Sequence, residues 1–472
     1  MAHAIEYRRL RAPREHGQTL IDPPLSSVAA LIAQNQSSSQ AAYANVFAGE
    51  ISLAELRQAA REELFAAAVA YTRGTLGACD VQASSRFILA GHQPELFHPG
   101  VWLKNFVLSA LGQRHGATAI NLIVDNDKAG LPSIRVPSFI DGKAVASAIA
   151  LDDPLSERAY EERPVLNERL FADFAKAVDP SGARLVTPLW QQMDPAQKNL
   201  GLRLAAARHR LEHAHGLRTL EVPLSTVCDT PSFARFALHL LLELPRLRNI
   251  YNQALADYRK ANHVRSEAHP VPELDQQDQW LEAPLWIWSR ERPQRRQAFA
   301  RRDGDRIIVS DRDQLHVELP LAAGRITQDT IAAWLASAAR GIKLRPRALI
   351  TTMYARLLLS DLFLHGIGGA KYDQLTDAII EQMFGLTPPH YLTVTGTFKL
   401  HRVNAVETAA RLREAQHQLH ELPYHPEASI AADSAKVQAL VEEKRRLVLD
   451  PPLKGNRKAW HDAIVALNVR LL

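Results

Sequence analysis

The sequence predicts an α/β protein with a Rossmann-like parallel-sheet core, a small β-rich insertion and a C-terminal α-helical hairpin. The apolar runs at residues 87–90 and 119–124 are short enough for buried strands, and a helix-like run at 101–111 lies between them. Strand, helix and strand in this order form a βαβ unit, whose right-handed crossover brings both strand ends to one edge of a parallel sheet. Amphipathic helical sequence after residue 401 predicts the hairpin.

The length of 472 residues and the 46% hydrophobic content are those of an ordinary globular protein with two or more domains. We expect a helical segment at residues 1–85 and the core at 86–400, with the insertion near 265–320. The helical hairpin and a closing helix are expected at residues 401–472.

The net charge of +5 is mild for this length and spread along the chain, which favours anionic metabolites over a nucleic-acid partner. Cys79 and Cys228 have no partner nearby in sequence, so neither a disulfide framework nor a cysteine zinc site is expected. No apolar run reaches the roughly 18 residues of a membrane-spanning helix. The first residues lack the apolar centre of a signal peptide. These features predict a cytoplasmic protein with no membrane partner.

The segment before the first strand reads as helical. The Ser-rich residues 37–40 predict a loop, and the capping-box pattern at 52–55 predicts the start of a helix that continues to about Tyr71.

Beyond the second strand, residues 134–139 and 144–151 predict a hairpin around Asp141 and Gly142. Mostly helical sequence at 155–215 leads to another strand near 217–222, and a long helix is expected at 233–262. The insertion alternates like strands, with Asp303 and Gly304 at a turn.

Residues 344–400 form the second informative stretch. An arginine-bearing loop and a helix precede the apolar run 362–364, and a glycine-rich turn at 365–371 then opens another helix. From residue 401, two antiparallel helices joined by a turn at 422–426 are expected, followed by a last helix at 457–472.

Residues 86–106 carry the strongest signal for a ligand site. A polar loop between the end of a strand and the start of a helix is where open α/β sheets bind ligands, because backbone N–H groups and the helix dipole face an incoming anion. We expect a phosphate-bearing small molecule here. The candidates are Gly91, His92, Gln93, His98, Gly100 and Lys104.

His92 and His98 are the catalytic candidates, together with Lys104, because imidazole and ammonium groups can stabilise charge on a transferred phosphate. The alternative is that one histidine caps the helix and the other packs against Trp102. Lys104 either reaches a phosphate or extends to solvent, and Gln93 either binds a ligand or braces the loop.

Asp127 follows the second strand and is a candidate for binding a ribose or an amine, or for capping a helix. His92, His98, Asp125 and Asp127 could also hold a divalent ion, but their spacing matches no established ligand motif. We therefore assign no metal ligand.

The second glycine-rich stretch supplies further candidates, because glycines let backbone approach a ligand and cationic side chains can clamp anions. For His365, a place in the pocket and a place in the core are both open. The alternative for the cations is a solvated surface. These candidates are Arg345, His365, Gly368, Gly369 and Lys371.

Trp280, Trp286 and Trp288, with Arg290 and Arg292 beyond them, could stack on bases or sugars. Their alternation favours instead one face of a β-insertion that packs on the core.

The sequence resembles the cysteine-adding enzymes of bacillithiol biosynthesis, as a divergent relative. In that family a strand ending in Gly-Gln-Gln leads through a proline-bearing turn into a lysine-containing helix, like residues 91–93, 99–100 and Lys104 here. Its Leu-Arg-Pro segment and Gly-Gly turn look like residues 344–346 and 368–369. The match covers most of the chain in order, but its motifs are short.

Two positions depart from the family pattern. His92 stands where the family has its first glutamine, and residues 125–128, Asp-Asn-Asp-Lys, stand where it has Glu-Asp-His-Asp. The stretch at 268–272 and the closing helices follow the pattern.

The resemblance implies a Rossmann-like core related to nucleotidylyltransferases, a coiled-coil arm that forms a homodimer, and a nucleotide, ATP or ADP, in the core. It implies a ligase or transferase that joins cysteine, or a similar amino acid or amine, to a small sugar-like acceptor. Two alternatives remain: a nucleotidylyltransferase of another metabolite, and a non-catalytic, nucleotide-binding dimeric scaffold.

Overall fold

The computed structural model describes the chain except residues 1–4, 6, 8, 9, 80, 82, 96, 97, 141, 142, 179–195, 400–404, 430–433, 453 and 454. It divides into two compact units, Met1–Lys399 and Leu400–Leu472. None of the helices in the described part of the chain has the length and apolar content needed to cross a membrane.

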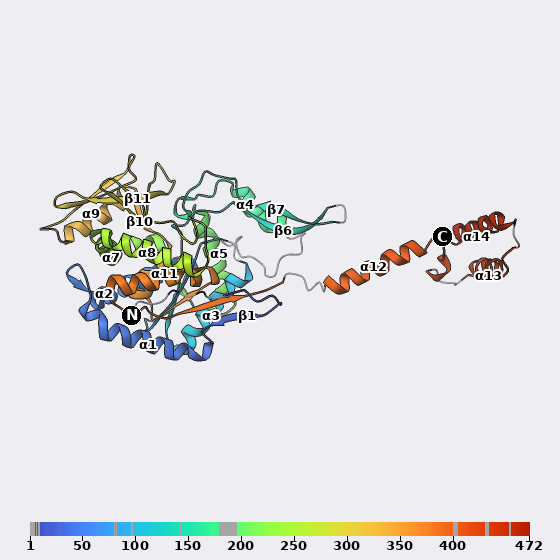
Figure 1. The fold of residues 1–472 in the computed structure, drawn as a ribbon, viewed down its shortest axis with the longest axis horizontal. Helices are drawn as coiled ribbons and strands as arrows, with labels where there is room; N and C mark the ends of the chain where they lie inside the picture. The colour runs from blue at the N-terminus through green and yellow to red at the C-terminus, as the bar shows by residue number, and fades with distance from the viewer. Residues whose placement is uncertain are drawn as a thin grey trace. The chain divides into compact units, whose positions relative to one another are not determined.

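A six-stranded sheet forms the centre of the first unit (Figure 1). Its strand order is β1-β16-β15-β4-β5-β8; all neighbours are parallel except β1, which pairs antiparallel with β16 at one edge. The strands predicted near residues 87–90, 119–124 and 217–222 are confirmed. The six are β1 (Thr19–Asp22), β4 (Phe87–His92), β5 (Thr118–Ile123), β8 (Leu220–Pro223), β15 (Leu362–His365) and β16 (Tyr391–Gly396).

The chain leaves β4 in one direction through β5 and β8, and later returns to the other side of β4 to form β15 and β16. The strand order therefore reverses between β4 and β15. In open α/β sheets, the crevice beside the carboxyl ends of such a strand pair is the usual place for a ligand.

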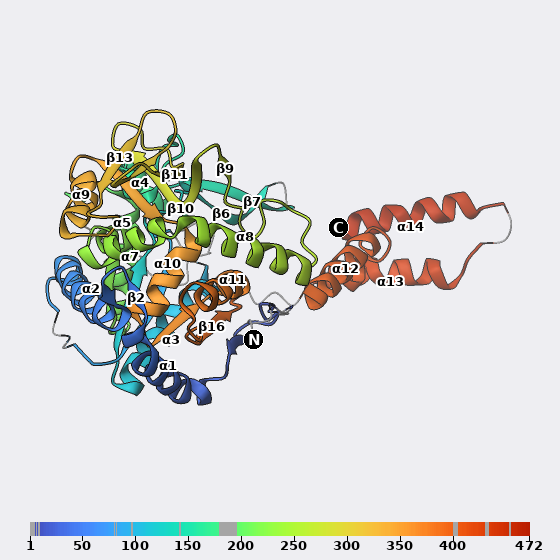
Figure 2. The ribbon, with the colours of Figure 1, turned by 60° about the vertical axis from the view of Figure 1, so that its left-hand side comes forward.

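Helices cover both faces of this sheet (Figure 2). Side chains alternate along β4, so Ile88 and Ala90 pack with α1 (Val28–Ala42) and α3 (Pro99–His115), whereas Phe87 and Leu89 join the larger core on the opposite face. That larger core includes α2, α7, α8, α10 and α11, which are Leu53–Leu76, Pro231–Leu242, Leu244–Ala261, Ala348–Tyr354 and Ile367–Phe384.

Two helix predictions need correction. The loop expected at 37–40 is part of α1, because its apolar residues and Asn35 face inward while the Ser and Gln side chains occupy the outer side. The long helix expected at 233–262 is two helices that meet at Glu243, where Pro245 in the first turn of α8 cannot donate to the preceding turn. The capping box is confirmed: Ser52 and Glu55 cap α2 reciprocally.

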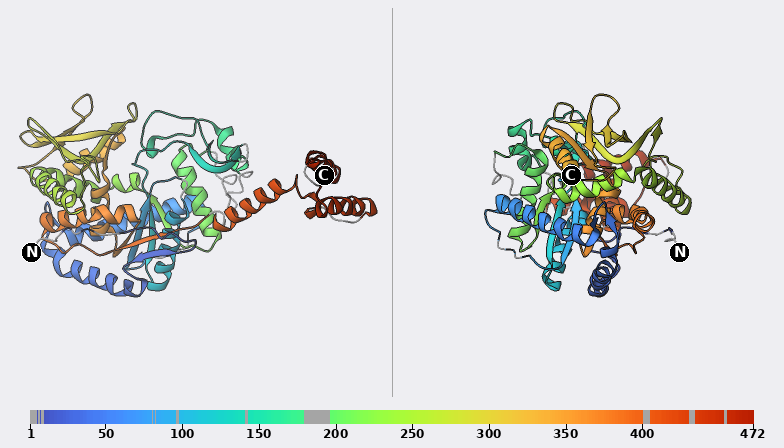
Figure 3. Two further views of the ribbon diagram at one scale, coloured as in Figure 1. Left: turned by 45° about the vertical axis from the view of Figure 1, so that its right-hand side comes forward. Right: turned by 90° about the vertical axis from the view of Figure 1, so that its left-hand side faces the viewer.

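A second sheet, which is antiparallel, packs against α8 and α9 (Gln328–Ala339) (Figure 3). The turn predicted at Asp303 and Gly304 joins two of its strands. Residues 344–346, expected in a loop, are instead strand, with Arg345 opposite Trp286. The strands are β9 (Gln276–Gln277), β10 (Trp280–Ser289), β11 (Arg296–Arg302), β12 (Arg306–Ser310), β13 (His316–Pro320) and β14 (Ile342–Pro346).

Smaller elements complete the first unit. The predicted hairpin is present as β6 and β7, and its turn residues 141 and 142 lie outside the described residues. The helical prediction for 155–215 includes residues 179–195, which are likewise undescribed. These elements are β2 (Phe47–Ala48), β3 (Ile51–Ser52), β6 (Ser133–Ile140), β7 (Lys143–Ala150), α4 (Glu168–Val178), α5 (Leu200–Ala214), α6 (Leu224–Cys228) and a π-helix at Ala355–Leu359.

The second unit holds α12 (Ala405–Glu421), α13 (Ala435–Leu449) and α14 (Arg457–Leu471). Leu440 on α13 packs with Leu467 and Leu471 on α14, and the Trp460 indole donates to the Leu447 carbonyl. The packed helix pair therefore lies later in the chain than the hairpin predicted from residues 401–450.

Candidate functional site

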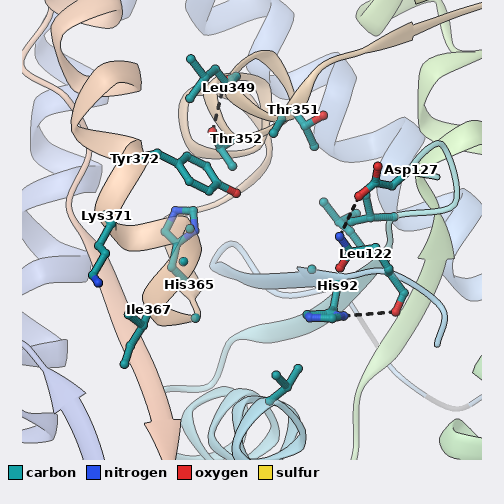
Figure 4. A pocket seen from close by; sticks show the side chains of 18 of the residues that line it. His92, Leu122, Asp127, Leu349, Thr351, Thr352, His365, Ile367, Lys371 and Tyr372 are labelled. Carbon is teal, nitrogen blue, oxygen red and sulfur yellow. Dashed lines mark hydrogen bonds between the residues drawn. The ribbon is translucent and has the colours of Figure 1, made fainter. Parts of the chain in front are cut away.

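A cavity of about 860 Å³ opens at the carboxyl ends of β4, β5 and β15. Its volume is in the range of small-molecule sites. All predicted site residues except Arg345 line it: Gly91, His92, Gln93, His98, Gly100, Lys104, Asp127, His365, Gly368, Gly369 and Lys371. His92 and Asp127 lie on one side of the cavity, and His365, Lys371 and Tyr372 on the other (Figure 4).

Lys104 is buried in the second turn of α3 and does not extend to solvent. Its Nζ donates to the Gly91 carbonyl at 2.5 Å, which ties the helix to the end of β4. Burial, with a smaller effect from Arg208, lowers the pKa of Lys104 to about 8. The ammonium is therefore charged at neutral pH, and its positive charge is poorly solvated.

His92 ends β4, and its Nδ1 lies 3.3 Å from the Gln93 carbonyl. Burial and then the nearby Lys104 lower the pKa of His92 to about 4. The ring is therefore neutral at pH 7. It can exchange hydrogen bonds with a ligand, but it does not supply a positive charge.

His98 is the N-cap of α3, and its Nδ1 accepts a hydrogen bond from Gly100 N at 3.1 Å. This is the capping role that the sequence left open for one of the two histidines. Gly100 lies against β16, since a Cβ at this position would be 2.1 Å from the Gly396 carbonyl oxygen. The start of α3 is thus held close to the sheet.

Gln93 and Asp127 connect the loops that follow β4 and β5. Gln93 Nε2 donates to Asp127 Oδ2 at 2.7 Å, and Arg295 Nη1 donates to Asp127 Oδ1 at 2.9 Å. Asp127 also accepts from the Lys128 N–H. Both oxygens are engaged, so Gln93 braces the loop, and Asp127 holds an arginine of the insertion at the cavity.

His365 is both a core and a cavity residue. Its Nε2 lies 2.9 Å from Asp373 Oδ2, and Arg356 Nη1 donates to the same oxygen at 2.6 Å. Burial raises the pKa of Asp373, but Arg356 and His365 outweigh it, so this pKa lies well below its usual value. The permanently ionised carboxylate fixes the ring at the cavity wall. Gly369 leaves room for that ring.

Arg345 does not line the cavity. It is 1% exposed and forms paired hydrogen bonds with Glu161 and Asp229, so its guanidinium is occupied by two carboxylates. The expected anion clamp is a buried structural ion pair.

The three tryptophans do not form one group. Trp288 is fully buried, Trp280 lies against Arg301, and Trp286 lines the cavity. The packing alternative thus holds for Trp288.

Arg295, Arg347 and Trp286 are cavity residues that sequence reasoning missed or treated as packing. The Arg295 and Arg347 guanidinium carbons lie 4.8 and 4.4 Å from the Trp286 ring centroid. No sequence signal connects them to residues 91–104, because the antiparallel sheet brings them to the site from a distant segment.

The cavity wall is strongly cationic. Among the described lining residues there is one carboxylate, Asp127, against five cationic side chains: Arg11, Lys104, Arg295, Arg347 and Lys371. Arg295 and Arg347 are paired with Asp127 and Glu282, so the excess positive charge comes from the other three. Two helices also begin at this wall. The first turns of α3 and α11 line it. The N–H groups at the start of α3 bond to His98, but Gly366, the N-cap of α11, has no side chain that could cap its helix. Both features favour an anionic ligand.

The described residues contain no group of three or more His, Cys, Asp or Glu side chains placed to hold a metal ion.

Fold and cavity together define a mixed α/β protein with a cationic small-molecule pocket at the carboxyl edge of its parallel sheet. No model of a known protein family matches the chain, and no curated protein matches its sequence.

Proposed function

We propose that the protein is a ligase-like or transferase-like enzyme that binds a nucleotide, ATP or ADP, in this cavity. The observation that carries the proposal is the excess of cationic side chains, together with the uncapped N-terminus of α11, where the strand order reverses. The strand order β16-β15-β4-β5-β8 also supports a Rossmann-like core, because it matches the two-way winding of dinucleotide-binding folds.

In this proposal the enzyme joins cysteine, or a similar amino acid or amine, to a small sugar-like acceptor, as the bacillithiol resemblance implies. The first turn of α11, which no side chain caps, binds phosphate oxygens with backbone N–H groups, whereas the N–H groups at the start of α3 already bond to His98. Lys104 stabilises charge that develops on the transferred phosphate, because a buried ammonium close to the reaction is poorly screened. His92 acts as a neutral hydrogen-bonding group, in line with its low pKa.

The first test is titration of the full chain with ATP and ADP by calorimetry. We expect binding to the wild type and clear weakening in Lys104→Met and His92→Ala. His316→Ala is the matched control, because His316 is exposed on β13 and does not line the cavity. Absence of binding by both nucleotides would contradict the proposal.

Turnover separates the proposed enzyme from its alternatives. Incubation with ATP, an amino-acid panel and amino-sugar acceptors should yield a joined product. Pyrophosphate release with an acceptor that becomes nucleotidylated would identify a nucleotidylyltransferase instead. Nucleotide binding without any product, and with affinity as the only property changed in His92→Ala, would identify a scaffold.

We also propose a homodimer formed through the second unit. Its helices expose several large apolar side chains that a partner's helices would cover: Leu412, Leu419, Leu449 and Val469, each more than half exposed. Light scattering should give twice the mass of 52.5 kDa. A monomeric mass at micromolar concentration would contradict the dimer.

A further inference from the structure

We propose that Trp286, Arg295 and Arg347 form a subsite that recognises a carboxylate of a small-molecule substrate. We call this group the tryptophan corner. The inference rests on the proposed function only in placing reacting molecules in this cavity. It adds the chemical group that this other part of the cavity wall would take.

The main observation is a buried arginine with donors left over. Arg347 is 8% exposed and lines the cavity, and its Nη2 donates to Glu282 at 2.5 Å. Its Nε and Nη1 are buried and have no hydrogen-bond partner among the described residues. Buried donors are almost always paired, and leaving one unpaired costs on the order of 1–3 kcal/mol. Both nitrogens are closed off from the open cavity in this structure, so a ligand must displace the Arg347 side chain slightly to accept from them, and its binding would remove that cost.

Arg295 shows the same pattern beside it. Its side chain is 12% exposed, its Nη1 donates to Asp127 and to the Asn126 carbonyl, and its Nε is buried without a partner in the described part of the chain. Both guanidinium groups contact the Trp286 ring. This contact holds the two guanidinium groups beside the partly exposed ring.

The charge balance favours a carboxylate over a phosphate. Arg347 is paired with buried Glu282 and Arg295 with Asp127, so the corner is formally neutral before a ligand binds. A doubly charged phosphate would bring two negative charges beside two existing carboxylates. A carboxylate brings one charge and two planar acceptor oxygens, which suits guanidinium donors.

The surroundings also suit a carbon skeleton attached to that carboxylate. Tyr251, Val271 and Pro272 line the adjoining wall, and Tyr251 is buried near Arg347 and Glu282. Apolar wall with a few fixed polar groups is the usual composition of a small-molecule site.

Calorimetry with succinate and inorganic phosphate on the full chain tests this subsite. Arg347→Lys and Arg295→Lys keep the charge but remove the guanidinium donors, so we expect each to weaken succinate binding about tenfold and to leave phosphate binding unchanged. Arg292→Lys is the control, because Arg292 is an exposed arginine near the same sheet that does not line the cavity. Circular dichroism checks folding, and Trp286→Phe provides a third readout if Arg347→Lys does not fold.

The proposal is overturned if the wild type gives no heat with millimolar succinate, or if the arginine variants weaken phosphate instead of succinate. The outcomes also separate it from the proposed function. Succinate binding that depends on Arg347, without any ATP or ADP binding, supports the subsite and contradicts the nucleotide enzyme. Nucleotide binding that depends on Lys104, without succinate binding, supports the proposed nucleotide-binding function and contradicts the carboxylate subsite.

Discussion

The His365 imidazole occupies the space that a side chain at Gly369 would need, since a Cβ there would lie 2.6 Å from His365 Nδ1. His365 cannot easily move, because Asp373 holds its Nε2 and the Phe363 and Tyr391 rings lie beside it. The glycine-rich turn therefore serves the packing of one cavity-wall histidine.

Gly369→Ala should lower the free energy of unfolding by about 1–3 kcal/mol, as overpacked sites do. Gly368→Ala is the matched control: a Cβ there meets nothing within 4 Å, so we expect no loss and a gain of up to about 1 kcal/mol from helix propensity. Urea unfolding of the three proteins measures both. Equal stability of the two variants would show that the His365 ring adjusts at no cost.

The free energy of unfolding of Lys104→Met, relative to that of the wild type, should be higher at pH 7 than at pH 9.5. The folded-state pKa of Lys104, about 8, is below the unfolded value, so the unfolded chain binds more protons between these pKa values and wild-type stability rises with pH there. The free energy of unfolding of the variant minus that of the wild type should fall by about 2 kcal/mol from pH 7 to pH 9.5. Chemical unfolding at the two pH values checks this, and an unchanged difference would contradict a strained, buried ammonium.

Arg345→Met should destabilise the protein by about 3–5 kcal/mol, because it leaves Glu161 and Asp229 without their shared cation. Arg325→Met is the control, since Arg325 forms an exposed pair with Glu50 and should change stability by no more than about 0.5 kcal/mol. Nucleotide affinity of the folded fraction should be unchanged. A selective loss of affinity with normal stability would restore the anion-clamp hypothesis for Arg345.

The free energy of unfolding of Asp125→Asn, relative to that of the wild type, should be higher at pH 8 than at pH 5. Burial, and then the negative charge of Glu161, raise the pKa of Asp125 to about 7. A carboxyl group whose folded pKa is raised contributes stability below its unfolded pKa and loses it as pH rises through about 7. The neutral amide does not ionise, so it avoids that loss. Thermal unfolding at both pH values measures the difference, and a pH-independent effect would rule out this cause.

Local patterns explain which parts of the fold could be predicted. Residues 87–90 are apolar because both faces of β4 are covered, and His98 before Pro99 has the chemistry of a helix cap. The loop prediction for residues 37–40 was wrong because polar side chains occur on the outer face of a helix as well as in a loop. Local sequence does not distinguish these two cases.

The candidate site was predictable only where it lies next to strand ends. Gly91 and His92 end one strand and Asp127 follows the next; both strands could be recognised in the sequence, and the three residues do line one cavity. The tryptophan corner could not be inferred, because it depends on how the antiparallel sheet packs. Arg345 was misassigned for the same reason: Glu161 and Asp229, which neutralise it, come from separate segments.

Strand β1 pairs only with β16 in the sheet, and Leu10, Arg11 and Ala12 just before it contribute to the cavity wall. During synthesis β1 leaves the ribosome long before its partner, and β4 likewise waits for β15. Contacts between segments so far apart in sequence form slowly, because a long loop must close first. The pocket is therefore expected to assemble last, so a nascent chain that stops before residue 391 would expose an unpaired strand edge and have an incomplete cavity wall.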